Sequence, residues 1–281
     1  MLDAGPAGPR YSIPNVNHED AATSINWSDI ERRTLLGWVL RMPLRLLPKN
    51  MRMPILKGPA KDMSWIVGSA SYGCWLGTYE LQKQEALERF VRNNMTIYDI
   101  GAQAGFYTLF FSSLVGGGKV YAFEPFGENI HNLLSHVGIN QLENVRVIQA
   151  AASARSVLGA FTVDRGESQN YLVNDGADIF IVPTISLDDA VDVHGLAPPD
   201  LVKVDVEGSE TSVLEGAHEI LVRYQPIVFV ALHTYEQSLR CGDILEAVDY
   251  QIFALGGDAP SEHQFASEIY ALPRRQISKE R

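Results

Sequence analysis

A glycine turn follows a short apolar run near the middle of the chain, in the segment Ile97-Tyr-Asp99-Ile-Gly101-Ala-Gln-Ala-Gly105. Glycine at such a turn tolerates a positive φ and lets a ligand approach the backbone closely. A helix that begins just after Gly105 would direct its free N–H groups toward the turn. Glu124 comes at the end of the next apolar run, where carboxylates commonly accept both hydroxyls of an adenosine ribose. The pattern is typical of a nucleotide-binding site.

Two cofactors compete for this layout. A dinucleotide site uses the spacing G-x-G-x-x-G to place a pyrophosphate on the helix end, but residue 103 is Gln and Asp99 stands two positions before Gly101. A carboxylate there would repel a pyrophosphate and attract the amino group of S-adenosylmethionine, which carries a sulfonium and no phosphate. The loop therefore favours S-adenosylmethionine. A nicotinamide-dependent oxidoreductase and a catalytically silent binding protein of the same fold are the alternatives.

A second group of ionisable residues stands at the end of a later apolar run, where Lys203, Asp205 and Glu207 alternate along the chain. Alternation in a strand directs them to one side, and ligands gather at the carboxyl ends of parallel strands. His233 ends the next apolar run, and histidine is the residue type whose ordinary pKa best suits a general base. We expect all four to be catalytic, with Lys203 pairing one carboxylate. The alternatives are a lysine–carboxylate network of Lys203, Asp205 and Glu207 that only fixes the strand end, and a capping role for His233 through a hydrogen bond to the backbone. The other histidines, His136 among them, are expected at the surface.

Asp205 and Glu207 also offer oxygen ligands to a divalent cation. Two carboxylates do not define a metal site, and Glu236 is the only further acidic residue close to His233 in the sequence. A metal is therefore an open hypothesis rather than a prediction, and dependence on Mg²⁺ or EDTA would decide it.

A parallel sheet is needed to bring these residues together. Apolar runs alternate with helix-like runs from residue 81 onward, which predicts an α/β fold with helices on both faces of the sheet. The long connection 152–200 is expected to hold a hairpin or an active-site flap near 159–173 and a short helix at 187–191. The expected strands are 97–101, 119–125, 145–151, 201–206, 227–232, 250–255 and 268–272, and the expected helices are 81–93, 106–114, 130–138 and 210–224.

Composition narrows the function classes. The chain has 281 residues, 46% hydrophobic and 20% charged, which is typical of a globular protein. Its net charge of −11 makes it a poor candidate for nucleic-acid binding. The two cysteines are far apart and fit a reducing compartment. No signal peptide or membrane-spanning run is apparent, so a cytoplasmic location is expected.

The N-terminal segment has a different character. A helix is expected from Ser28 to about Pro43, and residues 27–57 carry seven basic against two acidic side chains. Its apolar face would cover the main domain or a second copy, giving a homodimer through this helix. The alternative is a basic amphipathic segment that meets a membrane surface or an acidic acceptor.

Further motifs connect these observations to a known family. In chain order they are Trp75-Leu-Gly77-Thr-Tyr79-Glu80, the glycine turn, Ala122-Phe-Glu124-Pro125, Thr184-Ile-Ser-Leu187-Asp188-Asp189, Lys203-Val-Asp205-Val-Glu207-Gly208-Ser-Glu210 and Leu214-Glu-Gly216-Ala217. Over residues 75–255 this order and spacing resembles the FkbM family of S-adenosylmethionine-dependent methyltransferases. One departure is Gln103, where the family usually has Asn.

The resemblance implies a class I methyltransferase fold, a Rossmann-like, seven-stranded and mostly parallel α/β sheet with a reversed last strand. This domain would span residues 75–281 with an insertion near 152–200, after a partly helical N-terminal extension, 1–74. The resemblance also implies methyl transfer to a hydroxyl group of a sugar or of a glycosylated or polyketide natural product, so the expected partner is a small-molecule or saccharide acceptor.

The resemblance further implies the cofactor contacts. Asp99 and the turn would hold the methionine end of S-adenosylmethionine, Glu124 the ribose hydroxyls, and Asp205 with Glu207 would lie beside the transferred methyl group. The implied cofactor-binding residues are Tyr79, Glu80, Asp99, Gly101, Ala102, Gln103, Gly105, Phe106, Glu124, Pro125, Phe126, Ala151, Ala152, Ser168 and Asp205.

Overall fold

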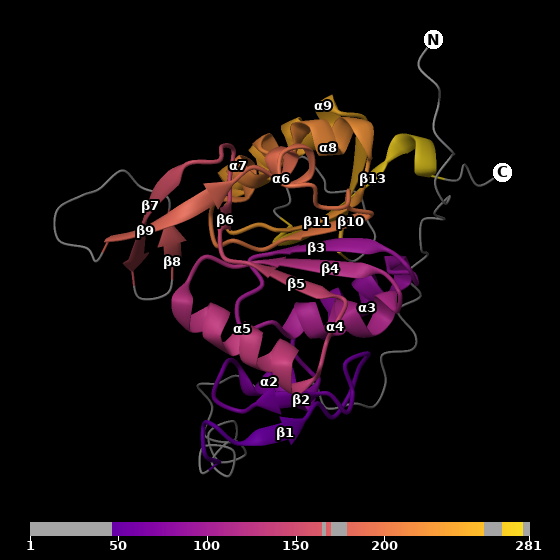
Figure 1. Cartoon of the computed structure of the whole chain (residues 1–281). Coiled ribbons are helices and arrows are strands. Elements are labelled where there is room, and N and C mark those ends of the chain that lie inside the picture. The colour runs from indigo at the N-terminus through magenta and orange to yellow at the C-terminus, as the bar shows by residue number, and fades with distance from the viewer. Residues whose placement is uncertain (1–46, 165–166, 170–178, 256–265, 278–281) are drawn as a thin grey trace.

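The computed structural model of the chain describes residues 47–164, 167–169, 179–255 and 266–277 (Figure 1). The helix expected from Ser28 to Pro43, and the homodimer expected through it, lie outside the described residues.

One seven-stranded sheet forms the centre of the molecule, in the order β12-β13-β11-β10-β3-β4-β5. The five strands from β11 to β5 are parallel, and β13 is antiparallel to both of its neighbours. The mostly parallel α/β sheet with a reversed strand is therefore confirmed. The strand bounds are β3 Thr96–Ile100, β4 Lys119–Phe123, β5 Val145–Ile148, β10 Leu201–Val204, β11 Ile227–Ala231, β12 Tyr250–Ala254 and β13 Glu268–Pro273.

Helices cover both faces of this sheet (Figure 1). Neighbouring residues of β3 belong to different cores, since Ile97 packs in the core beneath α3 and α4, and Tyr98 packs in the core beneath α7, α8 and α9. This alternation is what a strand buried on both faces requires. The helix bounds are α3 Leu81–Phe90, α4 Phe106–Val115, α5 Gly127–Ile139, α6 Leu187–Asp192, α7 Glu210–Glu215, α8 His218–Arg223 and α9 Tyr235–Ala247.

The order of the strands in the sheet indicates where a ligand-binding site can form. Strands β3 and β10 are neighbours, but the chain leaves β3 toward β4 on one side and leaves β10 toward β11 on the other. The loops after β3 and β10 therefore diverge at the carboxyl ends of the strands. This is the position at which open α/β sheets form a ligand-binding crevice.

The predicted strand 145–151 is wrong in one respect, because it is two strands in two sheets. β5 ends at Ile148, and the chain resumes as β6 (Ala151–Ala152), which pairs with β9 (Ile179–Ile185). β9 also pairs with β7 (Leu158–Asp164), and β7 pairs with β8 (Glu167–Gln169), so the hairpin expected within the long connection is confirmed. These strands form an arm beside the main sheet (Figure 1).

The predicted helix 210–224 is broken into α7 and α8 near Gly216. A Cβ atom on Gly216 would lie 2.1 Å from the carbonyl oxygen of Ser153, so the backbone of the arm approaches there. Helix α9 was absent from the expected elements. Its signal is the capping box formed by Thr234 and Gln237.

The described part of the N-terminal extension is a hairpin, β1 (Arg52–Pro54) with β2 (Ser64–Ile66), followed by the short helix α2 (Tyr72–Leu76). Trp65 of β2 and Trp75 of α2 are buried in the same core as α3 and α4. The described residues therefore extend the main core, whereas the division of the chain at residue 75 stays a prediction.

His136 forms hydrogen bonds to both this hairpin and the glycine turn. The prediction that it lies at the surface is wrong. The ring is fully buried and stacks on Trp65 with 3.9 Å between centroids. Its Nδ1 lies 2.7 Å from the carbonyl oxygen of Ala104, and its Nε2 accepts a hydrogen bond from the backbone N–H of Ile66 at 3.0 Å. Burial lowers the pKa of His136 to about 4, against the opposing effect of the Ala104 carbonyl.

The neutral form of His136 should make stability depend on pH. Its contribution is complete above the unfolded-state pKa of about 6.5 and is lost as the pH falls toward 4. We expect the free energy of unfolding in urea to fall by about 2 kcal/mol more between pH 7.5 and pH 5 in the wild type than in His136→Gln. His131→Gln changes an exposed histidine of the same helix and should keep the wild-type difference. Equal pH dependence in all three proteins would contradict the assignment.

No helix among the described residues is both long and apolar enough to cross a membrane.

Candidate active site

The glycine turn after β3 has the predicted backbone conformation. Gly101 has φ +74° and Gly105, which precedes α4, has φ +96°. A Cβ atom on Gly101 would lie 1.9 Å from the carbonyl oxygen of Asp205. The turn can therefore pass the end of β10 this closely only with glycine at that position.

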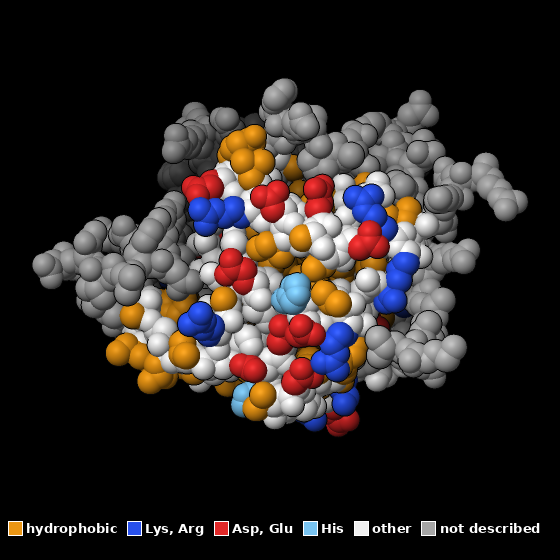
Figure 2. Space-filling view, turned by 90° about the horizontal axis from the view of Figure 1, so that it is seen from above, with side chains coloured by type: hydrophobic (Ala, Val, Ile, Leu, Met, Phe, Trp, Pro, Cys, Tyr) orange, Lys and Arg blue, Asp and Glu red, His pale blue; other side chains and the backbone are white. Residues whose placement is uncertain are grey.

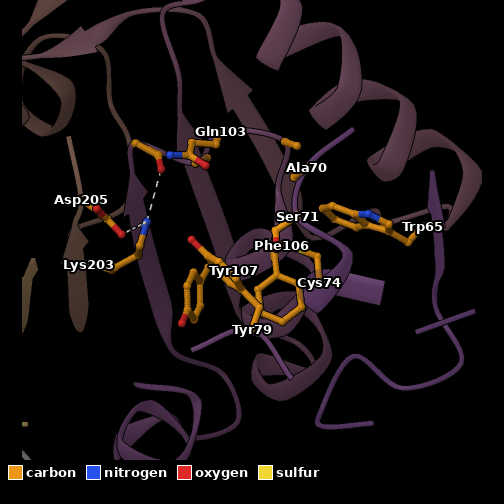
Figure 3. Close-up of a pocket in the computed structure, with 13 residues that line it drawn as sticks. Trp65, Ala70, Ser71, Cys74, Tyr79, Gln103, Phe106, Tyr107, Lys203 and Asp205 are labelled. Carbon is orange, nitrogen blue, oxygen red and sulfur yellow. Dashed lines mark hydrogen bonds and ion pairs between the residues drawn. The ribbon is translucent and has the colours of Figure 1, made fainter. Parts of the chain in front are cut away.

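Two cavities meet at this turn. The first cavity lies against the N-terminal extension, and the second lies between the end of β4 and the arm (the first is drawn in Figure 3). Gly101, Gln103 and Asp205 line both. The first cavity is also lined by Trp65, Ala70, Ser71, Cys74, Tyr79, Ala102, Ala104, Phe106, Tyr107 and Lys203. The second is also lined by Phe123, Glu124, Pro125, Phe126, Asn129, Ala150, Ala151, Ala152, Phe161, Val206, Glu207 and Ser209.

Glu124 is held rigidly in the wall of the second cavity. Its Oε2 accepts from the backbone N–H of Gln103 at 2.9 Å, and its Oε1 accepts from the backbone N–H of Phe126 at 3.0 Å and from Asn129 at 3.1 Å. Burial raises the pKa of Glu124 against the lowering effect of these donors. Each carboxylate oxygen has two lone pairs, so Oε2 keeps one acceptor position for a hydroxyl group of a ligand.

Asp99 lies beneath the turn. It is fully buried, and its Oδ1 accepts from Lys203 at 3.0 Å while its Oδ2 accepts from Thr108 at 2.7 Å. Lys203 also donates to the carbonyl oxygen of Gly101 at 3.3 Å. Among the described residues, Asp99 is not part of the lining of either cavity. In this structure it supports the turn through Lys203, and its direct contact with a cofactor stays a prediction.

Lys83 of α3 forms ion pairs with carboxylates from three different segments of the chain. Its Nζ lies 3.0 Å from Glu80, 3.1 Å from Asp205 and 2.6 Å from Glu268, and its side chain is only 4% exposed. Burial alone would lower the pKa of Lys83, but the three carboxylates raise it above its ordinary value. Tyr107 lies beside both lysines and donates to Glu80 at 2.8 Å.

Asp205 begins a group of side chains at the ends of β10 and β11. One ligand atom from each of Asp205, Glu207 and His233 lies within 4.8 Å of the others. His233 Nε2 is 3.4 Å from Glu207 Oε2 and 3.7 Å from Glu210 Oε1. Burial raises the pKa of Asp205, but the ammonium groups of Lys203 and Lys83 outweigh it and hold the pKa below its ordinary value.

The structure brings most of the predicted cofactor contacts to the two cavities. Of the described residues predicted to bind the cofactor, Glu80, Asp99 and Gly105 are outside both linings, and the side chain of Ser168 lies outside the described part. The predicted catalytic residues divide between the two cavities and the adjoining group. Lys203 lines the first cavity, Glu207 lines the second, Asp205 lines both, and His233 stands beside them without lining either.

Some residues of the site were missed from the sequence. Lys83 had a detectable signal, because it precedes the buried Ala86 and Leu87 by three and four positions and so shares their helix face. Glu268 and Phe161 had no such signal. Glu268 comes from the reversed strand β13 and reaches Lys83, and Phe161 comes from the arm and lines the second cavity. Only the tertiary arrangement brings them there.

The fold and site together define a class. A glycine turn after the first parallel strand, a buried acidic residue after the second and a reversed strand in a seven-stranded sheet are the features of a class I S-adenosylmethionine-dependent methyltransferase. Residues 99–256 match the Methyltransferase FkbM domain, which is more than half of the 281 residues. The chain belongs to the FkbM methyltransferase family, and the resemblance seen in the sequence is confirmed.

Solved structures with a similar fold include three methyltransferase or related chains. The methyltransferase FkbM from Methylobacillus flagellatus KT has 19% identity and TM-score 0.46, and the match covers 63% of this chain and 43% of that one. An S-adenosylmethionine-dependent O-methyltransferase from Thermotoga maritima has 14% identity, TM-score 0.43 and coverages of 72% and 67%. Fibrillarin from Aeropyrum pernix, solved with natively bound S-adenosyl-L-methionine, has 17% identity, TM-score 0.43 and coverages of 65% and 68%.

The chain spans less than half the length of the Methylobacillus protein. A search of curated proteins found no match.

Proposed function

We propose that the protein transfers a methyl group from S-adenosylmethionine to a hydroxyl group of a sugar or of a glycosylated or polyketide natural product. The observation that carries the proposal is the junction of the two cavities at Gly101, Gln103 and Asp205, directly beside the ionisable group at the ends of β10 and β11. A cofactor laid across this junction would have its centre next to that group.

The residues present fit S-adenosylmethionine. The second cavity offers the fixed carboxylate of Glu124 for the ribose, and apolar walls from Phe126 and Phe161, whose rings meet edge to face at 6.5 Å, for the adenine. The first cavity offers the polar wall of Lys203 and Asp205 and the ring of Tyr79 for the methionine end. When bound, S-adenosylmethionine supplies an electrophilic methyl group.

The proposed catalytic side chains are Asp205, Glu207 and His233, supported by Lys203. An alcohol is a weak nucleophile near neutral pH, so its proton must be removed or its pKa lowered as the bond forms. In the described part of the chain, these side chains are the ionisable cluster that adjoins both cavities. They would orient the hydroxyl group and take part in its deprotonation, while the walls of the cavities exclude water.

The proposed acceptor is a small molecule or a saccharide rather than a nucleic acid, because the net charge of −11 opposes a phosphate backbone. A cytoplasmic location is part of the proposal. The two cysteines support it, since Cys74 and Cys241 are free, buried thiols.

Glu124→Ala should weaken the binding of S-adenosylmethionine by about 1–3 kcal/mol, because charge-assisted hydrogen bonding to the ribose is lost. Isothermal titration calorimetry of the purified variant measures this directly. Glu128→Ala, which removes an exposed carboxylate from the start of α5, is the matched control. Unchanged affinity in Glu124→Ala would refute the ribose assignment.

His233→Ala should lower turnover by about 10²–10⁴-fold, the usual range for a lost acid–base group, with little effect on cofactor affinity. His218→Ala changes an exposed histidine of α8 and should retain full activity. Wild-type turnover of His233→Ala at saturating acceptor would place the essential group elsewhere.

Titration of the protein with S-adenosylmethionine and, separately, with NADH tests the proposal before an acceptor is known. We expect micromolar binding of S-adenosylmethionine alone. Binding of NADH alone would favour the oxidoreductase, and binding of S-adenosylmethionine without turnover of any hydroxyl compound in a broad panel would favour a silent binding protein.

A further inference from the structure

We propose that Asp205, Glu207 and His233 form a binding site for one divalent transition-metal ion. The inference deepens the proposed function, because the ion would lie where the acceptor hydroxyl is expected, and its role in the reaction rests on that function. Its existence does not, since ion binding is measurable without cofactor or acceptor.

The donor set has the composition and closeness that a cation needs. Two carboxylates and one imidazole come from the ends of the neighbouring strands β10 and β11, with one ligand atom of each within 4.8 Å of the others. The loops are fixed, since the backbone N–H groups of His233 and Thr234 both donate to Gln237 at 3.1 Å, and Gln237 donates to the carbonyl oxygen of Gly208 at 2.8 Å. The two loops that carry the three donors are therefore held together by the side chain of Gln237.

Glu210 supplies an independent observation. Its side chain is fully buried, its Oε1 accepts from the backbone N–H of Gly208 at 3.0 Å, and its Oε2 has no hydrogen-bond partner within the described part of the chain. The same carboxylate faces the imidazole, with Oε1 3.7 Å from His233 Nε2. A buried carboxylate with an unsatisfied oxygen is costly unless positive charge stands nearby.

Within the described part of the chain, the two nearby lysines are already engaged by other carboxylates. Lys83 already binds Glu80 and Glu268, and Lys203 already binds Asp99, so these two lysines are matched by three carboxylates before Asp205 is counted. Asp205 and the buried Glu210 then remain as two further carboxylates close to one imidazole. One imidazolium ion would balance only one of these two charges, whereas a divalent cation would balance both with the imidazole neutral.

The donor types indicate which ions fit. Mg²⁺ and Ca²⁺ prefer all-oxygen sites, whereas a mixture of carboxylate and imidazole donors suits Mn²⁺, Fe²⁺, Co²⁺ or Zn²⁺. An ion here would act as a Lewis acid and lower the pKa of an acceptor hydroxyl bound to it. In this arrangement His233 would be a ligand of the ion rather than the base, and solvent would receive the proton as the O–H bond breaks. The oxygen then bonds to the methyl carbon of S-adenosylmethionine as the sulfur–carbon bond breaks, and the sulfur keeps the electron pair as a neutral thioether.

Titration with Mn²⁺, followed by electron paramagnetic resonance of the free ion, tests the site on full-length protein freed of metal with EDTA. We expect one ion per chain in the wild type, with at least tenfold weaker binding in Glu207→Gln and in His233→Ala. Glu236→Gln is the matched control, because Glu236 is a 75% exposed carboxylate close to His233 in the chain and pairs with Arg240. It should bind Mn²⁺ like the wild type.

Thermal unfolding of each variant shows that the fold is kept. Failure of the wild type to bind Mn²⁺ saturably, or equal binding in Glu207→Gln and His233→Ala, would overturn the inference. Calorimetry with S-adenosylmethionine on the same preparations separates the two proposals. Cofactor binding without Mn²⁺ binding rejects the metal site alone, and Mn²⁺ binding without cofactor binding rejects the proposed function alone.

Discussion

Replacing Gly101 with alanine is expected to lower the free energy of unfolding by about 3–5 kcal/mol and to abolish measurable binding of S-adenosylmethionine. The new Cβ atom would lie 1.9 Å from the carbonyl oxygen of Asp205, and neither atom belongs to a flexible side chain. The positive φ of +74° adds a further cost for any residue with a Cβ atom. Relief requires the turn after β3 to move away from the end of β10, which separates the residues shared by the two cavities. Urea unfolding and calorimetry measure the two effects.

Gly138→Ala is the matched control for this substitution. Gly138 lies in α5, and a Cβ atom there would meet nothing within 4 Å. The same change of residue should stabilise the protein by about 0.5–1 kcal/mol through helix propensity. Similar effects at the two glycines would show that the close approach of the turn to β10 has no energetic importance.

Lys83→Met should lower the free energy of unfolding by about 2–4 kcal/mol, because it leaves three carboxylates close together without their shared cation. This loss of stability is smaller than a fully buried ion pair would give, because solvent screens the charges. The side chains of Glu80, Asp205 and Glu268 are 31%, 16% and 24% exposed. Chemical unfolding at pH 7.5 is the measurement.

Two further variants separate the charge effect from the loss of a long side chain. Adding Glu268→Gln to Lys83→Met removes one of the three repelling charges and should recover part of the lost stability. Arg223→Met breaks the exposed pair of α8 with Asp192 and should change stability by less than about 1 kcal/mol. A double variant no more stable than Lys83→Met would argue against electrostatic repulsion as the cause.

The parallel strands and the glycine turn could be predicted from sequence because their signals are local. A buried strand such as 227–231 is a continuous apolar run, and the spacing of the glycines predicts the turn at Gly101. Glu124 was predictable for the same reason, since its role follows from its place at the end of a strand. These residues lie where the sequence pattern indicates them.

The rest of the site depends on contacts between distant segments. Nothing near Lys203 in the sequence shows that its main partner is Asp99 rather than Asp205, since the two aspartates are 3.0 Å and 3.9 Å away only after folding. At the break near Gly216 the backbone of Ser153 approaches closely, and His136 is buried where its ring stacks on Trp65 of the hairpin. Each of these features needs a partner segment whose position the local pattern does not encode.

The reversed direction of β13 has a consequence for how the protein folds. Because β13 runs against its neighbours, its first residue, Glu268, lies at the ligand-binding end of the sheet and reaches Lys83, while Lys83 also contacts Asp205 across 122 positions of sequence. Contacts between such distant residues form slowly, because a long loop must close before they contribute any stability. We therefore expect the site to be completed late in folding. A nascent chain in which β13 has not yet been synthesised could then form much of the sheet but would lack the ion pair between Lys83 and Glu268.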